Sequence, residues 1–288
     1  MPRPTLPPSA PRSHVRLSEV GELGLLAELE RRGLVEEVEH DAAAFDGGLV
    51  VTQDSLVDGV HFVLEWLSWR ELGFRAAAVN ISDLAASGAR PQALLVSLGV
   101  PAATELADVV ALYEGIAEAG VIVRGGDTTE AADAFVTVTA LGQAERVPGR
   151  AGARAGDALV VTGPLGAAAA AFREQRFVRP PLRVEEGVRL AQRANAMLDL
   201  SDGLEQDAAR IAERSGCRVV IELEQVPLAP GASGEDLGFG EDFELLAATP
   251  DPLDFPVIGR CEEGSGVEIR LRGATVELGG WSHFRSET

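Results

Sequence analysis

Hydrophobic and polar positions alternate along the chain with periods that predict both helices and strands. Apolar residues recur at helical spacing over 17–32, and Gly33 stands where a helix stop is expected. A β-branched run over 48–52 predicts a strand that delivers Gln53 and Asp54 to its end. The alanine-rich segment 69–87 predicts a helix, with Asn80 and Asp83 on one side of it because they lie three residues apart.

The rest of the chain continues this mixture of periods. Further strands are expected over 92–100, 121–124, 134–142, 158–162, 196–200 and 218–223. Further helices are expected over 105–119, 165–173, 181–194 and 206–215, with a loop over 224–240 and a hairpin over 267–278. Helices and strands in this order predict an α/β fold with mixed sheets on which the helices pack.

Two composition changes divide the chain. Residues 1–13 contain five prolines, which cannot join a helix interior or a central strand, so we expect a mobile arm over 1–16. Near 146–156, Pro, Gly, Arg and Ala replace the hydrophobic pattern, as is typical of a domain boundary. The 288 residues also exceed a typical single domain. We therefore predict an N-terminal domain over 17–148 and a C-terminal domain over 149–288.

Four short segments end a strand-like or small-residue run with an aspartate beside small residues. They carry Asp54, Asp83, Asp127 and the pair Asp199 and Asp202. Carboxylates of this kind suit Mg²⁺, which is usually held by a few acids together with substrate phosphates. Asp83 is the most informative of them, because a carboxylate on a nearly all-apolar helix needs a cationic or donating partner. The acids therefore indicate phosphate chemistry.

The positive residues narrow this interpretation. All 25 of them are arginines, and the chain contains no lysine. A P-loop and a protein-kinase site both require lysine, so both classes are excluded. Metal ions and arginine must then neutralise any bound nucleotide. The formal charge of −20 argues against binding to nucleic acid or to anionic membranes, which need dense positive patches.

Cysteine usage and hydropathy indicate the compartment. Cys217 and Cys261 are the only cysteines, and neither has a Cys or His neighbour at zinc-ligand spacing. No apolar run approaches the ~20 residues needed to span a bilayer, and no hydrophobic signal core is evident. We expect a cytoplasmic protein with reduced thiols.

Each acidic motif also has a structural interpretation without function. The sequence Gly125-Gly126-Asp127 is compatible with an ordinary turn, and Asp83 with a salt bridge to Arg75 or Arg90. Ser201 or Asp202 is compatible with simple helix capping.

Four further residues also have structural interpretations without function. Glu241 fits an exposed helix start, Tyr113 a core position, Arg150 a solvated linker charge, and His61 a structural role.

Taken together, the motifs resemble those of thiamine-monophosphate kinases, members of the aminoimidazole-ribonucleotide synthetase superfamily. The resemblance covers nearly the whole chain, from Gly21 to Phe284. Its specific parts are the stretches 52–62, 78–91, 125–128, 150–157, 199–204, 240–245 and 280–284. Several such stretches in the right order are far more specific than any one of them.

The resemblance implies a two-domain fold of the aminoimidazole-ribonucleotide synthetase type, a homodimer formed through the N-terminal sheets, and an active site near that interface. It also implies ATP-dependent phosphorylation of thiamine monophosphate to thiamine diphosphate, with several Mg²⁺ ions. The implied metal ligands are Asp41, Thr52, Gln53, Asp54, Asp83, Asp127, Asp199 and Asp202. The implied ATP contacts are Tyr113, Gly126, Asp127, Arg150 and Ser201, with Asp127 and Arg150 taking part in catalysis. The implied substrate contacts are His61, Glu241 and Trp281.

One departure from the family pattern bears on activity. The family usually reads Gly-Asp-Asp-Ala-Ala where this chain has Glu39-His40-Asp41-Ala42-Ala43. An imidazole is a poorer ligand for Mg²⁺ than a carboxylate, so one metal site is weakened, lost or supplied by Asp41 instead. Two alternatives stay open: another ATP-using member of the superfamily, and a degenerate protein that binds nucleotide or thiamine phosphate without turnover.

Overall fold

A computed structural model of the chain describes residues 15–35 and 40–281. The predicted N-terminal arm lies almost wholly outside these residues, and so does the end of the last family motif. Helix α1 (Leu17–Arg31) belongs to one compact unit and residues 39–281 to another. The predicted helix over 17–32 is confirmed, although Gly21 interrupts it with a φ of 67°. None of the helices described is long and apolar enough to cross a membrane.

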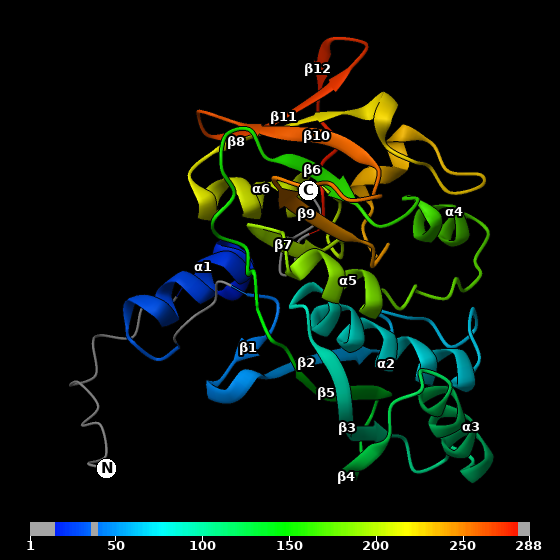
Figure 1. Cartoon of the computed structure of the whole chain (residues 1–288). Coiled ribbons are helices and arrows are strands. Elements are labelled where there is room, and N and C mark those ends of the chain that lie inside the picture. The colour runs from blue at the N-terminus through cyan, green and yellow to red at the C-terminus, as the bar shows by residue number, and fades with distance from the viewer. Residues whose placement is uncertain (1–14, 36–39, 282–288) are drawn as a thin grey trace. The chain divides into compact units, whose positions relative to one another are not determined.

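The first sheet of the larger unit has five strands in the order β1-β2-β5-β3-β4. Its strands are β1 (Ala43–Ala44), β2 (Leu49–Val57), β3 (Arg90–Val100), β4 (Val123–Glu130) and β5 (Phe135–Gln143). Helices α2 (Trp69–Ala86) and α3 (Leu106–Ala117) lie along the sheet (Figure 1). Apolar side chains such as Val50, Val96 and Val138 are buried in the core that these elements share.

The second sheet has seven strands in the order β12-β11-β8-β10-β6-β9-β7. Its strands are β6 (Ala158–Val161), β7 (Ala196–Asp199), β8 (Arg218–Glu222), β9 (Leu245–Thr249), β10 (Val257–Glu262), β11 (Gly266–Leu271) and β12 (Ala274–Val276). The helices of this half are α4 (Ala167–Arg173), α5 (Val184–Ala191) and α6 (Leu204–Ser215). Short 3-10 helices occur at η1 (Asp46–Gly48), η2 (Leu223–Gln225) and η3 (Gly234–Gly238).

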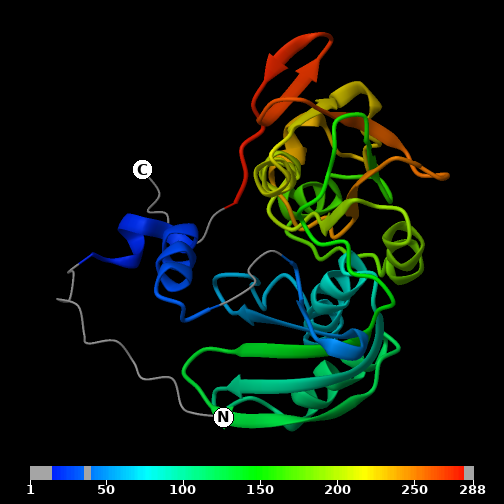
Figure 2. The same ribbon diagram turned by 60° about the vertical axis from the view of Figure 1, so that its left-hand side comes forward.

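Helix α2 lies between the two sheets, and this position brings its polar residues close to elements of both halves of the chain. Its C-terminal residues Ala85 and Ala86 are buried in one cluster with Leu190 of α5 and Met197 of β7. The helices approach closely, because a Cβ at Gly187 of α5 would lie 2.1 Å from the Ala85 carbonyl oxygen. Figure 2 shows α2 beside the first sheet and the second sheet beyond it. Residues near the end of α2 therefore face elements from both halves of the chain.

Most predicted elements are present, and three predictions are wrong in a way that matters for the site. Gln53 and Asp54 lie in the middle of β2, which is longer than expected. Gly125-Gly126-Asp127 lies within β4 and does not follow a strand as a turn. Strands β9 and β10 were not predicted at all. Pairing with neighbouring strands extends β2 and β4 beyond their β-branched residues, because a ladder is a tertiary interaction. The boundary between 148 and 149 stays a prediction.

Candidate functional site

Three aspartates from separate elements meet at the junction of α2 and the second sheet. Oxygens of Asp41, Asp83 and Asp199 all lie within 4.8 Å of one another. Asp41 precedes β1, Asp83 lies on α2, and Asp199 ends β7. A group of three carboxylates at this separation offers several oxygen ligands to one hard cation.

Hydroxyl and amide side chains orient these acids. Thr52 of β2 donates its Oγ1 hydrogen to Oδ2 of Asp83 at 2.6 Å, and Ser82 of α2 donates to Oδ2 of Asp199, also at 2.6 Å. Asn80 joins the same helix to β2, because its Oδ1 accepts the backbone N–H of Asp54 at 2.9 Å. The buried polar residues of α2 therefore hold the acids in place.

The electrostatics of the group favour a bound cation. Burial raises the pKa of Asp83 well above its ordinary value, and the charges of Asp54, Asp199 and Asp41 add to that rise. Burial also raises the pKa of Asp199, followed by the charge of Asp41. Like charges in a low-dielectric site cannot all stay ionised without compensation. A divalent cation bound by oxygen ligands would supply that compensation, so the donor set fits Mg²⁺.

The salt-bridge interpretation of Asp83 is wrong. Arg75 forms an ion pair with Glu241, and Arg90 pairs with Glu185 through Nη2 and Oε2 at 2.8 Å. Among the described residues, no ion pair joins Asp83 to either arginine.

Arg150 contacts the acidic group and is not a solvated linker charge. Its Nε and Nη2 both donate to Oδ1 of Asp41, at 3.0 and 2.5 Å. The side chain of Asp41 is 5% exposed and that of Arg150 is 22% exposed. An arginine thus stands at the rim of the three-aspartate group, where an anion would approach it.

His40 does not join the three aspartates. Its Nδ1 is buried without a hydrogen-bond partner and lies against Gly149, where a Cβ would come within 2.2 Å of it. The neighbouring Asp41 contributes a carboxylate to the group. Of the three outcomes considered for this departure from the family pattern, the geometry favours supply by Asp41.

A second acidic position lies just beyond β7. Asp202 forms an ion pair with Arg210, which also pairs with the buried Asp207 at 2.6 Å. The N-cap of α6 is Gly203 and receives no side-chain hydrogen bond, so the capping interpretation of Ser201 and Asp202 is wrong. The sequence analysis did not identify Asp207 and Arg210. Their spacing on an amphipathic helix is that of ordinary surface residues, and only the structure shows that Asp207 is buried.

Backbone hydrogen bonds bring the predicted substrate residues next to Asp202. Glu241 N–H donates to the Ser201 carbonyl, and Trp281 N–H donates to the Asp202 carbonyl, both at 2.9 Å. Glu241 does not begin a helix but has a φ of 58°, which is uncommon for a residue other than glycine. Such strain is often found where a side chain must be aimed at a ligand.

Arg75 holds the Glu241 carboxylate. The Arg75 side chain is only 11% exposed, and its Nη2 bonds Oε1 of Glu241. Burial raises the pKa of Glu241, while the charge of Arg75 opposes that rise. The sequence contains one signal for the contact of Arg75 with Glu241: Arg75 is the only charged residue in the stretch 72–82 of α2.

His61 is placed by its own loop. Its Nδ1 accepts the backbone N–H of Val57 at 3.1 Å, which fixes the orientation of the imidazole ring.

Asp127 and Asp54 do not meet within one chain. Asp54 is paired across the sheet with Val138, Val96 and Gly126. Asp127 belongs to the next row, which contains Ser55, Thr137 and Ser97. Side chains of successive rows point to opposite faces of a sheet, and three strand spacings separate β2 from β4, roughly 14 Å. Asp127 therefore lies on the opposite face from Asp54.

Gln53 shares the face of Asp127. Its row continues through Thr139, whose Oγ1 donates to Oε1 of Gln53 at 2.8 Å.

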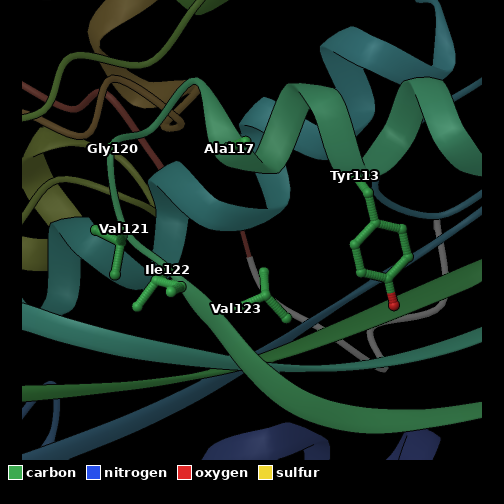
Figure 3. Close-up of a pocket in the computed structure, with 6 residues that line it drawn as sticks. All are labelled: Tyr113, Ala117, Gly120, Val121, Ile122 and Val123. Carbon is green, nitrogen blue, oxygen red and sulfur yellow. The ribbon is translucent and has the colours of Figure 1, made fainter.

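Tyr113 packs against the edge of the first core and also lines an apolar pocket between α3 and β4. The cavity has a volume of about 450 Å³ and is lined by Tyr113, Ala117, Gly120, Val121, Ile122 and Val123 (Figure 3). Partial burial raises the pKa of the phenol above its ordinary value. Gly126 follows on β4 with a φ of 150°, and a Cβ there would lie 1.7 Å from the Val96 carbonyl oxygen. Only glycine fits at this close approach.

Comparisons with known proteins show what the chain is similar to. Residues 39–144 match the family described as AIR synthase related protein, N-terminal domain. A thiamine-monophosphate kinase of Aquifex aeolicus is 34% identical over 310 residues, which cover 94% of this chain and 100% of the relative. One from Rhodopirellula baltica is 40% identical over 217 residues, 68% of this chain and 67% of the relative. A solved structure described as AaThiL complexed with AMPPCP and TMP aligns with a TM-score of 0.86 and 33% identity, covering 93% of this chain and 99% of that one.

Proposed function

The chain belongs to the thiamine-monophosphate kinase family, and from this premise we propose that it phosphorylates thiamine monophosphate with ATP to give thiamine diphosphate and ADP. The observation that carries the proposal is the group of Asp41, Asp83 and Asp199, whose carboxylates lie within 4.8 Å of one another with Arg150 beside them. A relative that matches 94% of the chain at 34% identity carries the same activity in its name. The alternatives of another superfamily activity or of binding without turnover are therefore not favoured.

Mg²⁺ would be held by Asp41, Asp83 and Asp199. Thr52 and Asp54 lie beside these acids, and Asp202 follows Asp199 by three residues. When bound, the metal would neutralise phosphate oxygens and the charge that develops on them. The set contains only oxygen donors, which Mg²⁺ prefers. We expect more than one ion, because Asp202 does not belong to the group that the other three aspartates form.

In the reaction, an oxygen of the substrate phosphate attacks the γ-phosphorus of ATP, and the bond from that phosphorus to the β–γ bridging oxygen breaks. A phosphate monoester has its second pKa near 6, so at neutral pH the attacking oxygen needs no general base. The chain therefore has to position two anions and stabilise their charge. We assign Arg150 to the ATP phosphates, because its Nη1 takes no part in the pair with Asp41.

Glu241, His61 and Trp281 would bind thiamine monophosphate. Backbone bonds place Glu241 and Trp281 on either side of Ser201 and Asp202, next to the end of β7. A carboxylate and an indole ring suit a cationic thiazolium, since aromatic faces attract cations. Ser201 would reach the phosphates from the same turn.

We further propose that the active site is shared by two subunits of a homodimer. Asp127 and Gln53 lie on the face of the first sheet opposite to Asp54, so one chain alone cannot bring Asp127 to the acids around α2. In a dimer formed through the first sheets, we expect Tyr113, Gly126 and Asp127 of one subunit to complete the site around the acids of its partner. A cytoplasmic location, where ATP is available and thiols such as the free Cys217 and Cys261 stay reduced, completes the proposal.

The test is a coupled assay of the purified protein with ATP, thiamine monophosphate and Mg²⁺. We expect ADP and thiamine diphosphate in equal amounts, and no product from Asp83→Asn. An Asp133→Asn variant, which makes the same chemical change at an exposed position outside the acidic group, is the control and should keep most of its activity. ADP release without thiamine diphosphate would contradict the proposal, as would full activity in Asp83→Asn.

A further inference from the structure

Three aromatic rings from separate segments form a small cluster at the surface. The Phe172 ring lies between Trp66, at 5.4 Å and 73° between the planes, and Phe239, at 5.1 Å and 46°. Trp66 and Phe239 are partly buried, whereas Phe172 is 52% exposed. One contact is edge-to-face and the other is tilted, and half of the central Phe172 side chain remains exposed, so another aromatic group can pack on it.

Each segment of this aromatic trio leads to a residue that the proposed function assigns to the substrate. Trp66 follows His61 by five residues in the same loop, and Phe239 precedes Glu241 by two. Phe172 lies on α4, and the N-terminus of α4 is bound to the residue after Glu241. Asp242 accepts the backbone N–H groups of Gly166 at 2.9 Å and of Ala167 at 3.1 Å. The trio therefore lies where the segments carrying the substrate contacts converge.

Ion pairs and hydrogen bonds hold the segments that carry the trio. Arg173, next to Phe172, forms an ion pair with Asp236 and donates to the Gly231 carbonyl at 3.1 Å, which fixes α4 to the turn that carries Phe239. Trp66 precedes the capping box of α2, in which Ser68 and Glu71 exchange hydrogen bonds. Rings held in this way can bind a ligand without first paying the entropy of ordering.

We propose that Phe172, flanked by Trp66 and Phe239, is the surface on which the ring system of thiamine monophosphate packs. The proposal rests on the proposed function for the identity of the ligand. Its physical basis is complementarity: the ligand is aromatic and cationic, and the trio offers an exposed aromatic side chain on segments that also carry the Glu241 carboxylate held by Arg75. The trio would then determine specificity for the organic part of the substrate while the acids and arginine bind its phosphate.

The test compares Phe172→Leu with Phe172→Tyr. Leucine keeps apolar packing on α4 but has no π face, whereas tyrosine keeps the face. We expect the KM for thiamine monophosphate to rise about tenfold in Phe172→Leu, with the KM for ATP and kcat within twofold of wild type. Phe172→Tyr should stay within twofold in all three constants. The thermal midpoint of both variants, measured alongside, shows whether α4 remains folded.

The outcomes separate this inference from the proposed function. If the wild-type protein makes thiamine diphosphate and Phe172→Leu has an unchanged KM for thiamine monophosphate, the trio is not a substrate surface and the inference fails alone. If the wild-type protein makes no product, the proposed function fails, and equilibrium dialysis with thiamine monophosphate decides the inference. Equal affinity of wild type and Phe172→Leu in that measurement would overturn it. A change in sedimentation without a change in KM would instead make Phe172 a subunit contact.

Discussion

Two nitrogens of the Arg150 guanidinium donate to a single oxygen, Oδ1 of Asp41, at 3.0 and 2.5 Å. This pair joins the segment between the two sheets to the loop before β1. The same carboxylate lies with Asp83 and Asp199, so the arginine compensates part of a charge that a cation would otherwise have to compensate alone. The pair thus links the proposed metal site to the proposed phosphate contact.

Position 41 and not position 40 should control the need for Mg²⁺. We expect Asp41→Asn to raise the Mg²⁺ concentration for half-maximal activity at least tenfold, because loss of a metal-site carboxylate costs on the order of 1.4 kcal/mol or more. His40→Asp should change it less than twofold, since His40 is not among the acids. A Mg²⁺ titration of initial rates checks both variants. A large gain of activity in His40→Asp would instead mark His40 as a damaged ligand.

Mixed dimers should show that the site is shared between subunits. Asp54→Asn and Asp127→Asn should each be inactive as pure proteins. After unfolding and refolding as an equal mixture, up to about a quarter of wild-type activity should return, because half of the dimers are mixed and each has one intact site.

The matched control is a mixture of Asp54→Asn with Asp83→Asn. Both of these changes affect acids on the same side of one chain, so no dimer in the mixture has an intact site. Activity in this control, or none in the Asp54 and Asp127 mixture, would argue against a shared site.

Removing Arg75 should weaken binding of thiamine monophosphate in a pH-dependent way. Burial raises the pKa of Glu241 and Arg75 opposes that rise, so Arg75→Gln should raise the pKa of Glu241 further. The ionised fraction then falls, and we expect the KM for thiamine monophosphate at pH 7 to rise about tenfold, as for loss of a charged hydrogen bond. The KM should recover as pH rises. Arg70→Gln, which removes the same charge from an exposed position, should leave the KM unchanged.

Asp242 should make the fold less stable as pH rises from about 4 to about 6. Burial raises its pKa from 3.8 to about 6, against the hydrogen bonds from Gly166 and its neighbours. The folded state then binds the proton more tightly than the unfolded chain does, so this contribution is present below pH 3.8 and lost above pH 6. Its size is about 3 kcal/mol.

Urea unfolding of wild type and Asp242→Asn at pH 4.5, 6 and 7.5 measures this contribution. The free energy of unfolding of the variant, relative to wild type, should rise with pH. Asp133→Asn, at an exposed position, is the control and should give a difference that does not change with pH. A constant difference for Asp242→Asn would show that its carboxyl does not titrate in this range.

Gly115→Ala should separate α2 from α3. A Cβ at Gly115 would lie 1.8 Å from the Arg70 carbonyl oxygen, and one at Gly73 would lie 1.9 Å from the Leu112 carbonyl oxygen. Overpacking of this kind costs about 1–3 kcal/mol. We expect a lower free energy of unfolding by that amount, measured in urea, and a raised KM for ATP because Tyr113 lies on α3. Glu114→Ala, at the neighbouring exposed position, should show neither effect.

Much of the fold could be predicted from local patterns. The helices over 69–87 and 105–119 and the hairpin around Arg272-Gly273 all follow from periodicity and turn residues, and the structure contains them. The strands β9 and β10 could not be predicted, because Leu245–Thr249 is mostly leucine and alanine, which favour helix, and β10 contains Gly259 and Arg260. Their extended conformation comes from pairing with β6, β7 and β8.

The sequence by itself determined the chemistry of this protein: which residues are acids, that arginine is the only strong base, and that the motifs stand in the order of one kinase family. Only the tertiary structure decided which acids act together. Asp41 joins Asp83 and Asp199, while His40 beside it and Asp127 on the far face of the sheet do not. Distance between side chains depends on strand order and helix packing, and neither can be read from spacing along the chain. The ion pair of Arg75 and Glu241 could not be predicted for the same reason. The two residues lie far apart in sequence and meet because α2 packs between the two sheets.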